Sequence, residues 1–201
     1  MYNKLLVKSA IVMAMAAPMF ASAESVVTTG AGTLTAAARL DFTIVIPKVL
    51  FLAVGTGSAG LVANPAINMV TFNYTTNPTA IGTGAAAGAI TGNAVPVRVL
   101  GNNGAITVTA ATTGAMSNGL GDTIPWSQIS AVSSDAANFP SPAIPLTGTG
   151  AASNIAVSSG KVTNRTATWT YSYANAAVVA AGTYGATTGN NSRITYTATM
   201  P

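Results

Sequence analysis

The sequence predicts an all-β protein, and three observations indicate this. Thr, Val, Ile and Tyr are abundant, whereas the good helix formers Glu, Lys and Gln are scarce. Apolar and polar residues alternate with a period of two in several segments, as expected when one face of a strand is buried. Turn-forming residues separate these segments at short intervals, which is typical of a β-sandwich.

The first residues predict a secretory signal peptide. Lys4 and Lys8 provide the positive start, residues 9–20 form a mostly apolar stretch, and Ala21-Ser22-Ala23 matches a cleavage site. The apolar stretch is too short to span a bilayer. We therefore expect residues 1–23 to be removed during export. The domain organisation that follows is a signal peptide (1–23), an N-terminal segment (24–42) and a β-sandwich domain (43–201).

Residues 34–46 give the longest alternating pattern, with apolar side chains at every even position, and Pro47 ends it because proline cannot donate to a strand ladder. The sequence Asn102-Asn103-Gly104 is a strong turn signal and predicts a hairpin between the alternating segments on either side. Loops are expected at residues 79–94 and 138–145. The other predicted strands are residues 49–54, 70–74, 95–99, 106–110, 167–173 and 193–200.

Charged residues make up only 6% of the chain, against about 25% in ordinary globular proteins. Lys4 and Lys8 belong to the signal peptide, so six of the eight Lys and Arg residues remain, and they are scattered. This excludes a dense basic patch for nucleic acid. A surface built from Thr, Ser, Asn, Gly and Ala has little charge repulsion and suits a protein that packs against copies of itself.

The residues that usually carry catalysis are nearly absent. The chain has no His and no Cys, which excludes a Ser-His-Asp triad, a thiol nucleophile and imidazole or thiolate metal sites. Asp122 is expected in a turn and Asp135 in a Ser-rich loop, and a surface pair with Arg39 accounts for Asp41. Residues 55–60 fit G-x-G-x-x-G, but Asn64-Pro65 opposes the helix that a dinucleotide site needs, so a glycine loop is expected. We expect no enzyme, no catalytic or metal site, no cofactor and no small-molecule substrate.

Aromatic residues are the remaining candidates for a binding surface, because aromatic rings can form a platform for sugars. Trp169 and Tyr171 fall on the regular apolar face of their predicted strand, which favours a place in the core. Trp126 follows Pro125 near a turn and is the freer of the two tryptophans. Tyr173 and Tyr196 complete the set of candidates.

The layout resembles pilins assembled by the chaperone–usher pathway, most closely the cysteine-free class that includes the CFA-type major fimbrial subunits. An alternating stretch of small residues, 33–41, runs directly into the apolar stretch 42–54. Residues 122–127 read Asp-Thr-Ile-Pro-Trp-Ser, a proline followed by a strand. Ala181-Gly182-Thr183-Tyr184 precedes the alternating terminal strand 193–200.

This resemblance implies an immunoglobulin-like β-sandwich that is incomplete and is completed by a strand donated from a neighbouring subunit. An unpaired edge strand is a template for another chain, and an alternating segment at a terminus is a suitable donor. Pairing of residues 34–46 within their own domain is the alternative. The candidate donor strand consists of Leu34, Ala36, Ala38, Leu40 and Phe42, and the candidate acceptor edge consists of Ile194, Tyr196, Ala198 and Met200.

These expectations favour a structural subunit of a bacterial surface filament or fimbria, with a role in adhesion or biofilm. Its partners would be copies of itself, with a periplasmic chaperone and an outer-membrane usher implied by the resemblance. The protein would pass through the periplasm to the cell surface. The alternative is a monomeric secreted or surface-bound β-sandwich that binds a glycan or a host surface.

Overall fold

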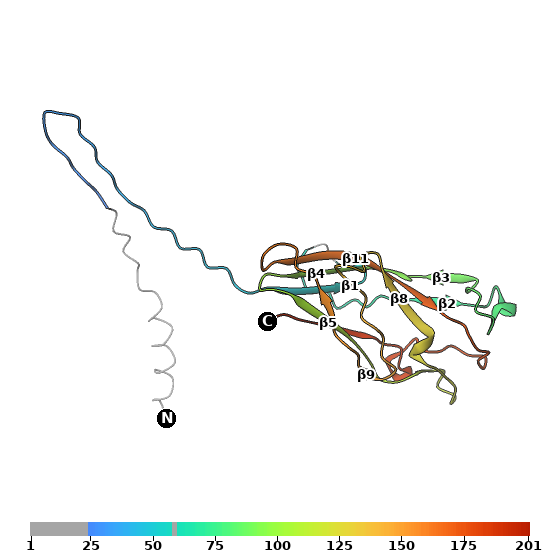
Figure 1. The fold of residues 1–201 in the computed structure, drawn as a ribbon. Helices are drawn as coiled ribbons and strands as arrows, with labels where there is room; N and C mark the ends of the chain where they lie inside the picture. Colours follow the sequence, from blue (N-terminus) through green and yellow to red (C-terminus); the bar gives the residue numbers. More distant parts are fainter. Residues whose placement is uncertain (1–23, 58–59) are drawn as a thin grey trace, which may run out of the picture. The chain divides into compact units, whose positions relative to one another are not determined.

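The computed structural model describes residues 24–57 and 60–201. The expected signal peptide and the centre of the glycine loop lie outside these residues. Contacts divide the chain into two units, Met1–Ile46 and Pro47–Pro201, and each is described here by itself. The second unit is built from antiparallel strands (Figure 1), so the predicted all-β class is confirmed. Within the described part of the chain, no helix is long and apolar enough to cross a membrane.

Two larger sheets make up the second unit. The first has the order β1-β4-β11-β8, and the second has the order β10-β5-β12, with β9 also paired to β5. Their strands are β1 (Leu50–Val54), β4 (Ala94–Gly101), β5 (Ile106–Thr112), β8 (Ile129–Ser133), β9 (Gly148–Thr149), β10 (Ser153–Ile155), β11 (Thr163–Tyr173) and β12 (Thr195–Thr199).

Smaller elements occupy the connections. Two short antiparallel pairs are formed by β2 (Thr71–Asn73) with β3 (Ala89–Thr91), and by β6 (Met116–Ser117) with β7 (Thr123–Ile124). Three single turns of 3₁₀ helix are found at Pro78–Ala80, Trp126–Gln128 and Thr188–Asn190.

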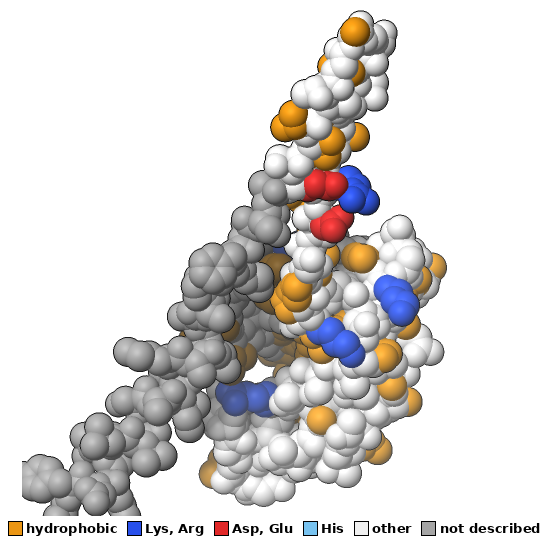
Figure 2. Space-filling view, turned by 90° about the vertical axis from the view of Figure 1, so that its left-hand side faces the viewer, with side chains coloured by type: hydrophobic (Ala, Val, Ile, Leu, Met, Phe, Trp, Pro, Cys, Tyr) orange, Lys and Arg blue, Asp and Glu red, His pale blue; other side chains and the backbone are white. Residues whose placement is uncertain are grey.

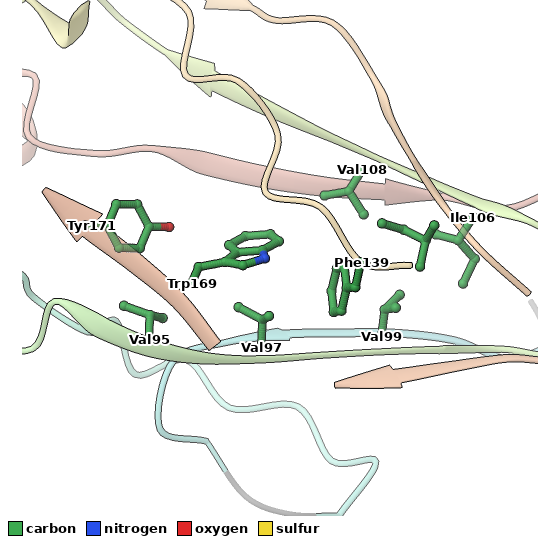
Figure 3. Close-up of a cluster of buried hydrophobic side chains, with 9 residues drawn as sticks. Val95, Val97, Val99, Ile106, Val108, Phe139, Trp169 and Tyr171 are labelled. Carbon is green, nitrogen blue, oxygen red and sulfur yellow. The ribbon is translucent and has the colours of Figure 1, made fainter. Parts of the chain in front are cut away.

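Side chains from both larger sheets meet in one core (Figure 3). Trp169 of β11 lies at its centre and is fully buried, with its ring 5.5 Å from that of Phe139 and 5.0 Å from that of Tyr196. The buried members of the cluster are Val95, Val97, Val99, Ile106, Val108, Phe139, Ile155, Trp169 and Tyr171. The two sheets therefore depend on each other for burial of their apolar faces.

The period-two patterns predicted the central strands β4 and β11 correctly. In β4 the three valines at positions 95, 97 and 99 are buried, while the intervening residues are more exposed. Trp169 and Tyr171 are buried on one face of β11, as expected from the sequence. Proline does not interrupt this sheet, although Pro96 lies within β4 and pairs with Thr168.

The predicted hairpin around Asn102-Asn103-Gly104 is wrong. β4 pairs with β1 and β11, whereas β5 pairs with β10, β9 and β12, so this turn connects the two sheets. Asn102 bonds the amide of Val49 and the carbonyl of Pro47, which ties the turn to the start of β1 instead of closing a ladder. A Cβ on Gly101 would lie 2.7 Å from Met200 Sδ, so glycine permits the close crossing between the sheets.

Two parts of the core were not predicted. The segment 138–145 was expected to be only a loop, yet it buries Phe139 completely against Trp169. The strand β10 lies in a stretch that shows no clear alternation, yet it supplies the buried Ile155, whereas the equally short β3, within the expected loop 79–94, is exposed. Three-residue strands are too short for a period of two to be recognised.

Trp169→Ala is expected to lower the free energy of unfolding of the protein by about 3–5 kcal/mol, because it leaves a cavity between the sheets. Urea unfolding followed by circular dichroism measures this. Thr170→Ala is the matched control, because Thr170 is the next residue and is exposed, and it should change the stability by less than about 0.5 kcal/mol. A loss below about 1 kcal/mol for Trp169→Ala would contradict the central position of this ring.

Candidate functional site

The last strand, β12, forms one edge of the second sheet and contains two of the candidate acceptor residues, Tyr196 and Ala198, while Ile194 and Met200 flank it. β12 pairs with β5 through the register Tyr196↔Ala110 and Ala198↔Val108. Among the described residues, no strand pairs with its other edge. The amide and carbonyl groups along that edge are therefore available to an added strand.

The core-facing side chains of β12 are only half-buried. Ile194, Tyr196, Ala198 and Met200 are all intermediate in exposure, while the residues between them are exposed. On the neighbouring strand β5 the corresponding inward residues are buried, and Ile106, Val108 and Ala110 have no exposed area. The core is thus closed at β5 and incompletely covered at β12, where one more strand would complete it.

β1 is an edge strand of the first sheet, and it approaches β12. Its core-facing residues Leu52 and Val54 are also only partly buried. Beyond it, the segment 61–69 exposes Leu61, Val62, Ile67 and Met69, and a groove of about 510 Å³ opens between this segment and β1. Apolar surface is therefore left uncovered along both β1 and β12.

Tyr196 links the open edge to the centre of the core. Its hydroxyl lies 2.7 Å from the hydroxyl of Tyr171, and the two form one hydrogen bond. Burial raises the pKa of Tyr196 far above its usual value, and the neighbouring Tyr171 raises it further. Burial also raises the pKa of Tyr171, while the hydrogen bond to Tyr196 acts in the opposite direction. Both phenols therefore stay neutral at physiological pH, and Tyr196 serves as packing and not as an acid.

The start of β1 and the end of β12 are held together by polar contacts. Lys48 Nζ donates to the carbonyl oxygen of Pro201 at 3.2 Å, and Asn103 Nδ2 donates to the same atom at 2.7 Å. Asn102 holds the carbonyl of Pro47 from the same turn. The second unit therefore begins, at Pro47, beside the C-terminal end of β12.

The candidate donor segment belongs to the first unit, and it is exposed. Residues 24–49 are not part of any sheet. The predicted strand at 34–46 is therefore extended chain without strand pairing, and the alternation remains only in the sequence. Large apolar side chains along it face solvent, with exposed fractions of 47% for Leu34, 76% for Leu40 and 83% for both Phe42 and Ile44. Ala36 and Ala38 are exposed as well.

The N-terminal segment folds back on itself. The carboxylate of Glu24 accepts hydrogen bonds from Arg39 Nη2 at 2.9 Å, and from Arg39 Nε and the Arg39 backbone amide at 3.0 Å each. The expected pair between Arg39 and Asp41 is therefore wrong, because Glu24 occupies the guanidinium. This contact lowers the pKa of Glu24 and raises that of Arg39. Asp41 is exposed, and no ion pair is recorded for it among the described residues.

Asp122 lies beside a turn, as expected, and Asp135, expected in a loop, also lies in a turn. Asp122 accepts a hydrogen bond from Asn118 Nδ2 at 2.9 Å, and Asp135 accepts from the amide and side chain of Asn138. In the described residues, no group of three or more His, Cys, Asp or Glu side chains could hold a metal ion. Figure 2 shows charged side chains thinly spread over the visible face of the described residues.

The expectation that Trp126 is the freer tryptophan is wrong. Its side chain is 4% exposed, and its Nε1 donates to the carbonyl of Gly114 at 2.7 Å. A buried ring with a satisfied N–H cannot form a platform for a sugar. The sequence could not reveal this, because the partner is a backbone carbonyl in a turn twelve residues earlier.

Comparisons with models of protein families, with curated proteins and with solved structures found no match.

Tyr196→Phe is expected to reduce the loss of stability in alkali. The pKa of Tyr196 is raised in the folded state, so the unfolded chain ionises first, near pH 10. The stabilising effect is present in full below pH 10 and is lost as the pH rises above it, by up to about 1.4 kcal/mol per pH unit for each such group. Urea unfolding between pH 8 and pH 11.5 should give a shallower decline for the variant.

At pH 8 the same variant should be less stable by about 1 kcal/mol, because the Tyr171 hydroxyl loses its partner. Identical slopes for the variant and the unchanged chain above pH 10 would show that Tyr196 is solvated in the folded protein.

Proposed function

We propose that this protein is a structural subunit of a surface filament or fimbria, with a role in adhesion or biofilm, in which each copy donates its N-terminal segment to the β12 edge of the next. The observation that carries the proposal is the exposure of the donor. Leu40, Phe42, Ile44, Val45 and Ile46 are each at least 75% exposed. Burying a side chain of this size contributes about 1.5–3 kcal/mol, so a segment of this kind favours a partner that covers it.

The acceptor supports the same proposal. β12 has one unpaired edge among the described residues and half-buried side chains on its core face. An added strand would satisfy the main-chain groups and cover Tyr196 and Ala198 in a single step. The chain would then be an incomplete immunoglobulin-like sandwich in which the two larger sheets face each other and one strand comes from a neighbour.

Donation within one chain is the alternative that the sequence left open. Residues 34–46 take part in no sheet, which favours donation to a second copy. The thin charge of the chain also suits close packing of copies. A monomeric glycan-binding protein is less well supported, because Trp126, its best candidate for a sugar platform, is buried.

Export through the periplasm to the surface follows from the expected signal peptide, and a chaperone and usher would protect the unpaired edge until assembly. An unpaired edge with exposed apolar side chains is an aggregation hazard, so a subunit that waits for its donor needs such protection. The proposal includes no catalytic step, no cofactor and no nucleic acid.

Ala38→Asp is expected to abolish polymers that survive SDS, whereas Ala37→Asp should leave most of them intact. Ala38 is on the face that would enter the core, where an unpaired carboxylate costs several kcal/mol. Ala37 is the next residue on the opposite face, so it is a control of the same residue type and exposure. Unboiled samples of the exported chain on SDS gels give the measurement.

In this experiment the unchanged chain should form a ladder that collapses to one band on boiling. A single band for the unchanged chain before boiling, or equal ladders for both variants, would show that residues 34–42 are not donated.

A further inference from the structure

We infer the direction and register of the exchanged strand: the donor runs antiparallel to β12 of a second copy, with Ala38 opposite Tyr196 and Asp41 opposite Arg193. The inference rests on the proposed function and adds to it which residues select the partner. It is argued from charge, from side-chain size and from the position of Pro47.

Charge fixes one pair. Asp41 is on the outward face of the donor, opposite to the face of Leu34 and Leu40, and it is exposed. Arg193 is on the outward face next to β12 and is also exposed. Neither has an ion pair with another described residue. Opposite charges facing each other across a strand pair stabilise it, and like charges destabilise it.

Side-chain size agrees with this register on the core face. With Asp41 opposite Arg193, the small Ala38 faces the large Tyr196, whose ring already packs on Trp169. No other side chain on β12 is as large as Tyr196, so the donor needs a small residue opposite it. The complete set of core-facing pairs is Leu40 with Ile194, Ala38 with Tyr196, Ala36 with Ala198, and Leu34 with Met200.

The parallel direction gives poorer pairs. With Asp41 again beside Arg193, a parallel donor places Ile44 next to Tyr196 and Ile46 next to Ala198. Two large side chains would then compete for the space beside Trp169, which overpacks the core. The antiparallel direction avoids this and leaves residues 43–46 at the junction between consecutive copies.

The position of Pro47 shows that an antiparallel donor comes from another molecule. Pro47 lies beside the C-terminal end of β12, as the bonds of Asn102, Asn103 and Lys48 establish. The preceding segment of the same chain, laid along its own β12, would therefore run parallel to it. An antiparallel donor from the same chain would have to return from Asp41, opposite Arg193, to Pro47 at the other end of β12. The distance from Arg193 to Met200 is roughly 23 Å at 3.3 Å per residue, whereas the six steps from Asp41 to Pro47 cover at most about 20 Å and leave nothing for a turn. The antiparallel register is thus a signature of exchange between copies.

Engineered disulfides test the register without interference, because the chain contains no cysteine. Two full-length chains are produced in the same cell, one carrying Ala37→Cys and the other carrying Thr195→Cys, Thr197→Cys or Thr199→Cys. These three threonines share the exposed face of β12 and are matched in residue type. Directly opposed residues in an antiparallel pair have Cα atoms about 4.5–5.5 Å apart, within the range of a disulfide, whereas diagonal neighbours lie about 7–8 Å apart.

Boiled, non-reducing SDS gels after mild oxidation measure the covalent dimer. The inference predicts a dimer at Thr197→Cys at least about fivefold more abundant than at the other two positions. A maximum at Thr195→Cys or Thr199→Cys would overturn the register while leaving strand exchange intact. The absence of a dimer at all three positions would overturn both. Each cysteine variant produced alone is the control, because it reveals any disulfide that forms between the same position in two copies.

Charge reversal gives an independent readout. Asp41→Arg and Arg193→Asp, each produced alone, place like charges at the proposed pair and should lower the yield of SDS-stable multimers by about two- to fivefold. Produced together, the two chains should restore the yield, because every contact between unlike copies again joins opposite charges. Thr43→Arg produced alone is the control, because it adds the same charge two residues away but keeps the Asp41–Arg193 pair, so it should retain the yield of the unchanged chain. An equal yield in all combinations would overturn the proposed pair.

Discussion

The unpaired edge of β12 is the constraint on which the organisation of this protein depends. A sheet buries its apolar face only where strands on both sides keep solvent out, and the core around Trp169 meets this condition at β5 but not at β12. The incomplete cover at β12 affects the centre of the core through Tyr196, which contacts Trp169 with its ring and Tyr171 with its hydroxyl. Whatever covers β12 therefore acts on the centre of the core and not only on its rim.

The N-terminal segment has the opposite requirement, because its apolar side chains need a sheet to cover them. It has alternating side chains and no sheet, so its apolar residues stay in water. Separately, each feature is a liability for aggregation, and in the proposed exchange they would act as donor and acceptor. The absence of cysteine is consistent with this arrangement, because a domain of this size without disulfides must gain its stability from its core or from a partner.

Alternation in the sequence predicted those strands that have a partner strand on each side, β4 and β11, and failed for residues 34–46, which have none. The valines of β4 alternate over five residues and the apolar residues of β11 over seven, and both the strands and the burial of these side chains were predicted. The connection at Asn102-Asn103-Gly104 was misjudged because local turn chemistry does not encode which sheet the next strand joins. Contacts of Asn102 with Pro47 and Val49, more than fifty residues away in the chain, decide it. Trp126 and Phe139 were misjudged for the same reason, since their partners are distant or are backbone groups.

For the candidate site, the sequence indicated a candidate donor segment and a candidate acceptor edge, but not whether either is paired with another strand. Alternation in residues 34–46 indicated a strand, and only the structure revealed that this segment lacks sheet partners. The sequence also could not predict that Arg39 pairs with Glu24 instead of Asp41. The local pattern around Arg39 does not indicate where the chain folds back to bring Glu24 beside it. That pairing leaves Asp41 available, and the proposed register depends on it.

Amide hydrogen exchange of residues 34–42 in assembled and dissociated protein tests the central claim most directly. In the dissociated chain these amides should exchange at the rate of unstructured peptide, because they belong to no sheet. In the assembled protein they should be protected to the same degree as β5, since they would be hydrogen-bonded within the same sheet. Rapid exchange of these amides in assembled protein would contradict the account, because it would show that the segment remains a free tail.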